Sequence, residues 1–325
     1  MGGNVPLLSV DDLSVSFRTE RGRAAVLDGV SFELQAGETL GLVGESGCGK
    51  SVTSLGITRL LPKPSGQIDR GSVRLDGQDL MELPAFEMQK IRGPRIGMIF
   101  QDAMTALNPV QRLSRQMDES IRLHAPTLSR AQATDRALEL LTDVGIPSPE
   151  LRLNDYPHQL SGGMRQRVMI AMALSAEPDL LIADEPTTAL DVTVQAQILM
   201  LIKRLQAERG MAVIFITHDL GVVAQVCQRV AVMYAGRIVE QGSVASLFSD
   251  PKHPYTQGLF NSIPHLDRVP LTPLPTIEGQ VPSPMDMPPG CRFAPRCQHA
   301  TAACQTRPVL QSNPDRAVAC HQVSL

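Results

Sequence analysis

The sequence has no apolar run long enough to cross a membrane and no excess of basic residues. A helix that spans a bilayer needs about 20 consecutive apolar residues, and no stretch of this 325-residue chain approaches that length. Lysine and arginine together number 30 against 33 aspartates and glutamates, which leaves a formal charge of -3 and no basic block. Proteins that bind nucleic acids carry clustered positive charge, so this balance gives that class no support.

We expect no secretory leader either. Residues 1–6 lack the apolar core of a signal peptide, and Pro6 breaks the pattern for N-terminal myristoylation. We therefore expect the chain to stay in the cytoplasm and to reach any membrane only through a partner protein. A chain of 325 residues is also long for one domain, which favours a main domain with an appendage.

What the sequence does contain is a glycine-rich phosphate-binding loop. Residues 44–51 fit the pattern G-x-x-x-x-G-K-[ST], between an apolar run at 39–43 that indicates a buried strand and a predicted helix at 52–61. In such a P-loop, successive N–H groups and the positive end of the helix converge on phosphates. This context argues against a chance glycine-rich turn. The loop consists of Gly44, Glu45, Ser46, Gly47, Cys48, Gly49, Lys50 and Ser51.

Lys50 and Ser51 supply the remaining chemistry of the loop. Lys50 adds a point charge near the β- and γ-phosphates, and the Ser51 hydroxyl is a suitable ligand for Mg²⁺, which prefers oxygen. The loop therefore predicts that the chain binds a nucleoside triphosphate with Mg²⁺.

An acidic pair follows a second buried strand. Residues 180–183 are continuously apolar, and Asp184 and Glu185 stand at the carboxyl end, where open α/β sheets bind ligands. Asp184 is expected to hold Mg²⁺ through water, and Glu185 to act as the general base toward the attacking water. The alternative is that these carboxylates only cap the following helix.

Two more polar residues follow apolar strands. His218 comes after residues 212–217 and is expected to contact the γ-phosphate, although a lone histidine is usually only a satisfied polar side chain. Gln101 comes after residues 96–100 and is a candidate ligand of Mg²⁺ or of the attacking water. Taken alone, that glutamine would indicate nothing.

The order of these motifs resembles that of ATP-binding-cassette ATPases over residues 7 to about 258. The resemblance rests on the Walker A loop at 44–51, the Q-loop at Gln101, the signature Leu160–Gln166, the Walker B motif Leu181–Glu185, the D-loop Ala189–Asp191 and the switch His218.

The resemblance implies an α/β P-loop NTPase core of the RecA-like type. An antiparallel β part is expected at the N-terminus, over residues 7–18, 31–34 and 71–76, and a helical signature subdomain at about 102–165. Within that insert, the amphipathic segments 113–124 and 129–145 predict two helices, with Ser129 as the N-cap of the second and Gly145 as its stop.

The same resemblance implies a head-to-tail dimer with ATP between two chains. Ser161 begins the predicted helix 162–174, and a helix N-terminus attracts anions. A plain N-cap is the alternative reading. The residues expected to bind the ATP held by the partner chain are Ser161, Gly162, Gly163 and Met164.

Two positions depart from the commonest pattern of the family. Met164 stands where many members have glutamine, but the serine and both glycines are intact, so we expect the signature to work. Phe17 is the candidate for the aromatic ring that stacks on the nucleotide, where many members have tyrosine. A role for Phe17 in the core is the alternative.

Other cassette proteins fit less well. A cassette ATPase of DNA repair would carry a long coiled coil between the P-loop and the signature, whereas residues 102–165 leave room only for short helices. A translation-factor protein would contain two cassettes in one chain, and this chain has one P-loop and one signature.

Two segments resemble the oligopeptide and dipeptide permease branch of the family. One is residues 102–109, just past Gln101, and the other is His253–Thr256 with Leu259 and Pro264 beyond it. The resemblance implies an ATPase subunit that energises import of di- or oligopeptides, with a nickel or glutathione importer as the alternative. It also implies a second ATPase subunit, two transmembrane permeases and an extracytoplasmic binding protein as partners.

The C-terminal extension, residues 259–325, is rich in proline and cysteine. Of the 25 prolines, 13 lie at or after Pro251, which predicts irregular structure. Four of the six cysteines follow the spacing C-x5-C-x6-C-x15-C, and clustered thiols in a cytosolic chain more often bind metal than form disulfides. They are Cys291, Cys297, Cys304 and Cys320.

Four thiolates suit either a [4Fe-4S] cluster or Zn²⁺. Similar tails in some peptide-permease ATPases carry an iron–sulfur cluster, so the resemblance favours [4Fe-4S] over Zn²⁺, and free thiols are a third option. Cys48, within the P-loop, and Cys227 need no metal role.

Overall fold

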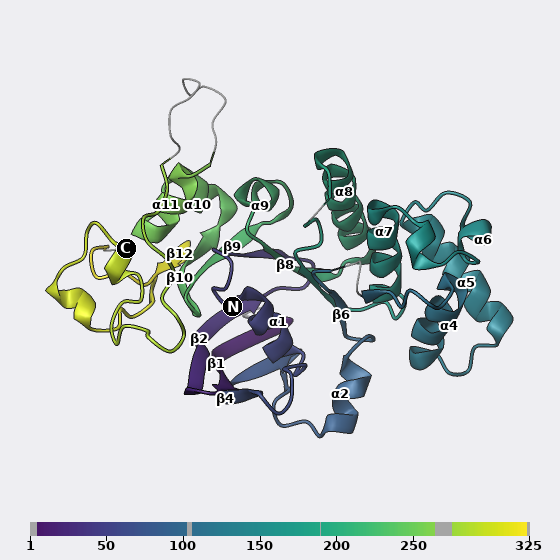
Figure 1. Ribbon diagram of the computed structural model, residues 1–325, viewed down its shortest axis with the longest axis horizontal. Coiled ribbons are helices and arrows are strands. Elements are labelled where there is room, and N and C mark those ends of the chain that lie inside the picture. Colours follow the sequence, from purple (N-terminus) through teal and green to yellow (C-terminus); the bar gives the residue numbers. More distant parts are fainter. Residues whose placement is uncertain (1–4, 103–105, 189, 264–274, 324–325) are drawn as a thin grey trace. The chain divides into compact units, whose positions relative to one another are not determined.

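A computed structural model describes residues 5–102, 106–188, 190–263 and 275–323 of the chain. The chain forms two compact units (Figure 1). The first consists of Met1–Leu34, Thr39–Met81 and Thr217–Leu325, and the second of Gln35–Glu38 and Glu82–Ile216. The predicted α/β architecture, with an antiparallel N-terminal part and a helical part, is confirmed.

An antiparallel sheet opens the first unit. Its strands β1 (Leu8–Thr19), β2 (Gly22–Leu34), β4 (Gly66–Leu75) and β5 (Gln78–Asp79) lie in the order β2-β1-β4-β5. In β2, residues 30–34 alternate between buried and less buried positions, as expected of a sheet with one face on a core, whereas residues 13–16 of β1 are all buried. Strand β1 lies within one residue of the predicted 7–18, whereas β2 and β4 begin earlier in the chain than the predicted 31–34 and 71–76.

The strand before the P-loop belongs to a different, mixed arrangement in the same unit. Strand β3 (Thr39–Val43) is buried along its length and pairs in parallel with β9 (Arg229–Tyr234). On its other side, β9 pairs antiparallel with β10 (Arg237–Ser243). The helices of this unit are α1 (Lys50–Ile57), α9 (Leu220–Val226), α10 (Val244–Ser249) and α11 (Pro254–Asn261).

The C-terminal extension continues that arrangement. Its strand β12 (Arg316–Val318) lies along β10 (Figure 1). Strand β11 (Gln311–Ser312) pairs with β12 in turn. Two short 3₁₀ helices, η2 (Ala294–Arg296) and η3 (Ala302–Gln305), complete the described part of the extension. The expected irregular structure is therefore largely present, but the extension also adds strands to the arrangement that carries the P-loop.

An aromatic cluster packs the extension onto α11 and β9. The ring of Tyr234 lies 4.6 Å from that of Tyr255 and 5.1 Å from that of Phe293, and both contacts are edge-on. All three side chains are buried, and Ile277 of the extension packs against the same cluster. Edge-on aromatic pairs contribute about 0.5–1.5 kcal/mol each beyond the burial of their area, so this cluster stabilises the attachment.

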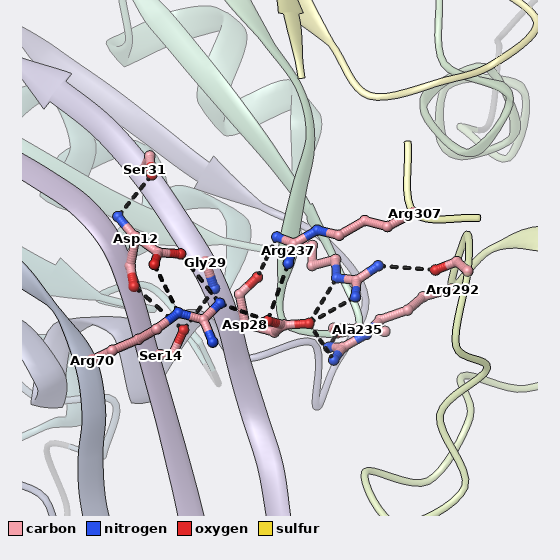
Figure 2. A network of polar contacts seen from close by, with 11 residues as sticks. Asp12, Ser14, Asp28, Gly29, Ser31, Arg70, Ala235, Arg237, Arg292 and Arg307 are labelled. Atoms are coloured by element: carbon pink, nitrogen blue, oxygen red, sulfur yellow. Dashed lines mark hydrogen bonds and ion pairs between the residues drawn. The ribbon is translucent and has the colours of Figure 1, made fainter. Parts of the chain in front are cut away.

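A group of arginines converges on Asp28 of β2 (Figure 2). Arg237 approaches Asp28 to 2.7 Å and Arg292 to 2.9 Å, while Arg70 and Arg307 lie at 3.2 and 3.3 Å. Arg292 and Arg307 come from the extension, so this carboxylate ties the extension to β2. Burial alone would raise the pKa of Asp28, but the hydrogen bond from Arg237 and the charges of Arg237, Arg292 and Arg307 lower it to about 2.

The second unit contains three parallel strands and most of the helices. Strands β6 (Ile96–Ile99), β7 (Leu180–Asp184) and β8 (Ala212–Thr217) lie in the order β6-β7-β8, with Ile99 beside Ala183 and Asp184 beside Ile216. Parallel strands bring their carboxyl ends to one edge, so the residues after β6 and β7 share that edge.

The helices of the second unit largely match the predicted insert. They are α2 (Ala85–Ile91), α4 (Leu113–His124), α5 (Arg130–Asp143), α6 (Pro149–Arg152), η1 (Pro157–Gln159), α7 (Gly162–Ala173) and α8 (Val192–Arg209). The predicted N-cap Ser129 is confirmed, since its hydroxyl accepts a hydrogen bond from the N–H of Gln132. Helices α4, α5 and α7 pack together (Figure 1).

Membrane-spanning character is not found in the described part of the chain. None of the helices there combines enough length with enough apolar character to cross a bilayer.

The convergence on Asp28 predicts a large stability loss for Asp28→Asn. The substitution leaves Arg237 and Arg292 with no carboxylate partner in the network, and we expect the free energy of unfolding near neutral pH to fall by about 3 kcal/mol. Urea unfolding followed by circular dichroism measures the change. The matched control is Asp69→Asn, whose exposed ion pair with Arg23 should contribute about 1 kcal/mol or less.

The same pair of proteins predicts a pH dependence. Because the pKa of Asp28 is about 2 in the folded protein and 3.8 in its ordinary state, its contribution is complete above pH 3.8 and is lost as the pH falls toward 2. The difference between wild type and Asp28→Asn should therefore shrink over that range. A difference that persists unchanged at low pH would show that the Asp28 charge is not its source.

Candidate functional site

The P-loop turns between β3 and α1 at positions that only glycine can occupy. A Cβ atom on Gly44 would lie 2.2 Å from the carbonyl oxygen of Met233, so the close approach of β9 excludes any side chain there. Gly49 has a φ of 106° and is the N-cap of α1. The glycines thus allow the strand to end and the helix to begin within the same tight loop, as the sequence predicted.

Lys50 lies inside this loop. Its side chain is buried, and its Nζ donates to the carbonyl oxygens of Gly44 at 2.8 Å and Glu45 at 3.0 Å. Two backbone carbonyls therefore position the ammonium group at the mouth of the helix, where phosphate binding requires a positive charge. Burial raises the pKa of the neighbouring Cys48 thiol, which is consistent with a packing role for this cysteine.

Tyr255 is a P-loop contact that sequence reasoning missed. Its hydroxyl accepts a hydrogen bond of 2.9 Å from the N–H of Glu45. The tyrosine belongs to the segment 253–256, which resembles the permease branch. The sequence thus drew attention to this segment, but it did not indicate that the tyrosine contacts the P-loop. His253 is the N-cap of α11 and accepts from the N–H of Tyr255, which places the tyrosine on the first turn of that helix.

The acidic pair stands at the end of β7 in the second unit. Asp184 is the last residue of the strand and is buried. Glu185 has a φ of 46°, a left-handed conformation that costs a non-glycine residue about 1–2 kcal/mol. Its N–H donates to the carbonyl oxygen of Ile216 in β8, which fixes the backbone in this conformation.

Two donors hold the Glu185 carboxylate. The side-chain amide of Gln101 donates to Oε2 at 3.2 Å, and the hydroxyl of Thr188 donates to the same oxygen at 2.8 Å. Gln101 and Glu185 follow two neighbouring parallel strands, β6 and β7, which brings their side chains into contact. Thr188 was missed, and only its place three residues after Glu185 could have indicated it.

The signature segment leads into α7. Ser161 is the N-cap of that helix, and its hydroxyl accepts from the N–H of Met164 at 3.3 Å. A Cβ on Gly163 would lie 2.6 Å from Cγ1 of Val194 in α8, so this glycine allows the two helices to approach each other. Ser161 and Gly162 are exposed to solvent at the helix start. Ser161 therefore caps α7, as the alternative reading proposed, and this end of the helix is still accessible to solvent.

The remaining predicted positions are distributed over both units. Ala189 of the D-loop lies outside the described residues, and Asp191 caps α8 by accepting from the N–H of Val194 at 2.9 Å. In the first unit, His218 is exposed immediately after β8. Phe17 is half-buried on β1, between Ala24 and Gly66 of the flanking strands.

The four cysteines of the extension do not form a metal site in the described part of the chain. Among those residues, no group of three or more histidine, cysteine, aspartate or glutamate side chains is placed to hold a metal ion. Burial, and the proximity of other thiols in the group, raise the pKa values of Cys291, Cys297 and Cys320, so the thiols stay protonated. The expected [4Fe-4S] or Zn²⁺ site is therefore not supported by this arrangement, and none of the four cysteines forms a disulfide.

Sequence comparisons match two family profiles to this chain. The profile of the ABC transporter family matches residues 27–188, and that of the oligopeptide/dipeptide transporter C-terminal region matches residues 239–304. The second match includes most of the segment from β10 through η3.

Curated relatives are similar over almost the whole chain. A probable peptide ABC transporter ATP-binding protein of Sinorhizobium fredii is 55% identical over 316 residues, which covers 97% of this chain and 94% of the relative. The oligopeptide transport ATP-binding protein OppD of Bacillus subtilis is 55% identical over 294 residues, covering 90% and 82%. A putative peptide import ATP-binding protein of Brucella melitensis is 51% identical over 97% of this chain and 94% of its own.

Solved structures show the same fold. The ATP-binding cassette MJ0796, in a dimeric post-hydrolysis state with ADP and Pi, aligns with a TM-score of 0.65 and 28% identity over 73% of this chain and 98% of its own. CbiO1 of Clostridium perfringens, part of an ABC transporter complex, aligns with a TM-score of 0.63 and 28% identity over 75% and 91%.

Proposed function

This chain belongs to the family of ABC transporter ATPases, and on that premise we propose that it hydrolyses ATP to energise the import of di- or oligopeptides. The observation that carries the peptide assignment is the match of its C-terminal region to that of oligopeptide and dipeptide transporters. Relatives named for peptide import, at 51–55% identity, support peptide over the nickel or glutathione alternative.

The P-loop forms the phosphate-binding half of the proposed site. Its N–H groups and the buried ammonium of Lys50 receive the β- and γ-phosphates of ATP. Ser51 would offer its hydroxyl to Mg²⁺, and Asp184 and Gln101 are the proposed further ligands; the ion would neutralise phosphate charge when bound. Phe17 stacks on the nucleotide, and His218 contacts the γ-phosphate.

Glu185 is the proposed general base. An ionised carboxylate accepts hydrogen bonds, and the donors Gln101 and Thr188 hold one of its oxygens in a defined position. The carboxylate orients the attacking water and takes its proton as the bond to the γ-phosphorus forms and the bond from that phosphorus to the β–γ bridging oxygen breaks, which releases ADP and phosphate. Backbone strain at this residue agrees with that role, because strained conformations concentrate at functional sites.

The signature serves a second chain in this proposal. Ser161, Gly162, Gly163 and Met164 stand at the accessible start of α7, and such a helix end is an anion site. They bind the γ-phosphate of ATP held on the partner's P-loop. The dimeric structures of the similar cassette MJ0796 support this arrangement. ATP then favours the closed dimer, and hydrolysis removes the ligand that closed it.

The other proposed partners follow from the importer assignment. Two transmembrane permeases would bind on the region of Gln101 and α4–α5, a second ATPase would complete the dimer, and an extracytoplasmic protein would deliver the peptide. The chain would then reside at the cytoplasmic face of the inner membrane through its permeases.

Substitution Glu185→Gln tests the general base. We expect ATP binding to be retained and hydrolysis to fall about a hundredfold or more, because the amide cannot accept the proton. The matched control is Glu177→Gln, at an exposed residue that also has a left-handed φ, 53°. Both are measured as ATP turnover and nucleotide affinity, and near-wild-type turnover by Glu185→Gln would exclude the assigned role.

Substrate class is tested on the assembled complex. In proteoliposomes that contain the permeases and both ATPases, di- or oligopeptides should stimulate ATP hydrolysis only when the binding protein is present. Nickel and glutathione serve as the competing substrates under identical conditions. Stimulation by either of these, without stimulation by peptides, would replace the proposed substrate.

The proposed function does not depend on metal binding by the extension, whose cysteines form no metal site among the described residues. Anaerobically purified protein should contain iron and zinc well below one atom per chain and lack the visible absorbance of iron–sulfur clusters. Stoichiometric iron with that absorbance would restore the [4Fe-4S] hypothesis, and it would show that the four thiols rearrange around the metal.

A further inference from the structure

An arginine of the extension forms a buried ion pair with the P-loop. Arg296, at the end of η2, donates from its two terminal nitrogens to the two carboxylate oxygens of Glu45, at 2.7 and 3.1 Å. Its side chain is only 4% exposed, and that of Glu45 is 30% exposed. Bidentate pairs of this kind are stronger and more directional than ordinary surface ion pairs.

The extension holds the guanidinium in place. The Nε of Arg296 donates to the carbonyl oxygen of Glu278 at 2.9 Å, and one terminal nitrogen donates to that of Ile277 at 3.1 Å. The group also lies 5.8 Å from the ring centre of Tyr234, within the range of a cation–π contact. The extension therefore fixes the position of the guanidinium group, and this group in turn contacts the carboxylate of Glu45.

Glu45 is held on its backbone as well as on its side chain. Its N–H donates to the Tyr255 hydroxyl at 2.9 Å, and its carbonyl oxygen accepts from Lys50 Nζ at 3.0 Å. The carbonyl that orients Lys50 thus belongs to the same residue that Arg296 grips through its carboxylate. A change at Arg296 can reach Lys50 through this one residue.

The negative charge of Glu45 also affects the binding of phosphate. Glu45 places a carboxylate in a loop whose other features, the helix start and Lys50, attract phosphate. Arg296 compensates that negative charge at direct contact. Without the arginine, the carboxylate would repel a bound triphosphate, and the repulsion would be weakly screened because the pair is largely buried.

We propose that Arg296 is a positioning residue of the nucleotide site, through which the C-terminal extension sets the affinity of the P-loop for ATP by neutralising the carboxylate of Glu45. The inference rests on the proposed binding of ATP by this loop. It assigns to the extension a role in nucleotide binding, separate from any role in metal binding or in contact with the permeases.

A double-substitution cycle on the full-length chain tests the proposal, with the dissociation constant of ATP·Mg as the readout. Arg296→Gln leaves the Glu45 carboxylate uncompensated, so ATP should bind about tenfold more weakly, a difference of about 1.4 kcal/mol. Glu45→Gln provides the background without that carboxylate, in which Arg296→Gln should weaken ATP binding much less. The double substitution should restore most of the lost affinity, whereas a purely structural clamp predicts no such rescue. A double variant as weak as Arg296→Gln would overturn the proposal.

Two further variants distinguish loss of the charge of Arg296 from a general detachment of the extension. Arg296→Lys keeps the charge and should bind ATP much more tightly than Arg296→Gln; equal loss in both would contradict the electrostatic role. Arg307→Gln removes another arginine of the extension, one that contacts Asp28 and not the P-loop, and should leave ATP affinity unchanged. Loss equal to that of Arg296→Gln would show that only undocking of the extension matters.

The experiment also distinguishes failure of this inference from failure of the proposed ATP binding. If the wild-type chain did not bind ATP·Mg, the proposed function would be wrong. Normal wild-type affinity together with unchanged affinity in Arg296→Gln would overturn this inference alone. Thermal unfolding of each variant identifies a chain that has lost its fold. If Arg296→Gln does so, the ATP affinities of Arg296→Lys and Glu45→Gln are compared in its place.

Discussion

The pairing of β9 on both of its edges is the constraint on which the first unit depends. One edge meets β3, which ends in the P-loop, and the other meets β10, onto which the extension adds β12. The carbonyl of Met233 in β9 also lies so close to Gly44 that no side chain fits there. Because buried backbone groups must be paired, neither the P-loop strand nor the extension can move far without breaking this pairing.

Two carboxylates receive the arginines that complete this attachment. Asp28 accepts from Arg292 and Arg307, and Glu45 accepts from Arg296. An arginine fork is well suited to such contacts, since it stays charged when partly buried and matches the geometry of a carboxylate. The aromatic rings of Tyr234, Tyr255 and Phe293 supply the apolar part of the same interface. The extension is therefore joined to the P-loop by packing, strand pairing and charge together.

The second unit holds the carboxylate of Glu185 in a defined position at the edge of its parallel strands. Neighbouring parallel strands bring Gln101 and Glu185 to one edge, and a left-handed backbone at Glu185 lets Oε2 accept from both Gln101 and Thr188. The cost of that backbone conformation is offset by the hydrogen bond to β8. Membership of the ABC transporter family explains why these groups occur with a P-loop and a signature in one chain.

Local patterns in the sequence determined much of this protein. The P-loop with its flanking strand and helix, the polar residues after β6 and β7, and the helix at 113–124 all depend on neighbours a few residues apart, and their spacing is visible in the sequence. Only the tertiary structure decided what the extension does. Strands β11 and β12 are too short and polar to leave a periodic pattern, and Arg296 meets Glu45 across 251 residues of sequence. The cysteine spacing indicated metal ligands, and the four thiols do lie near one another, but among the described residues they are not placed to hold a metal ion. Long-range contacts of this kind come from the packing of whole elements, for which a single sequence carries no local signal.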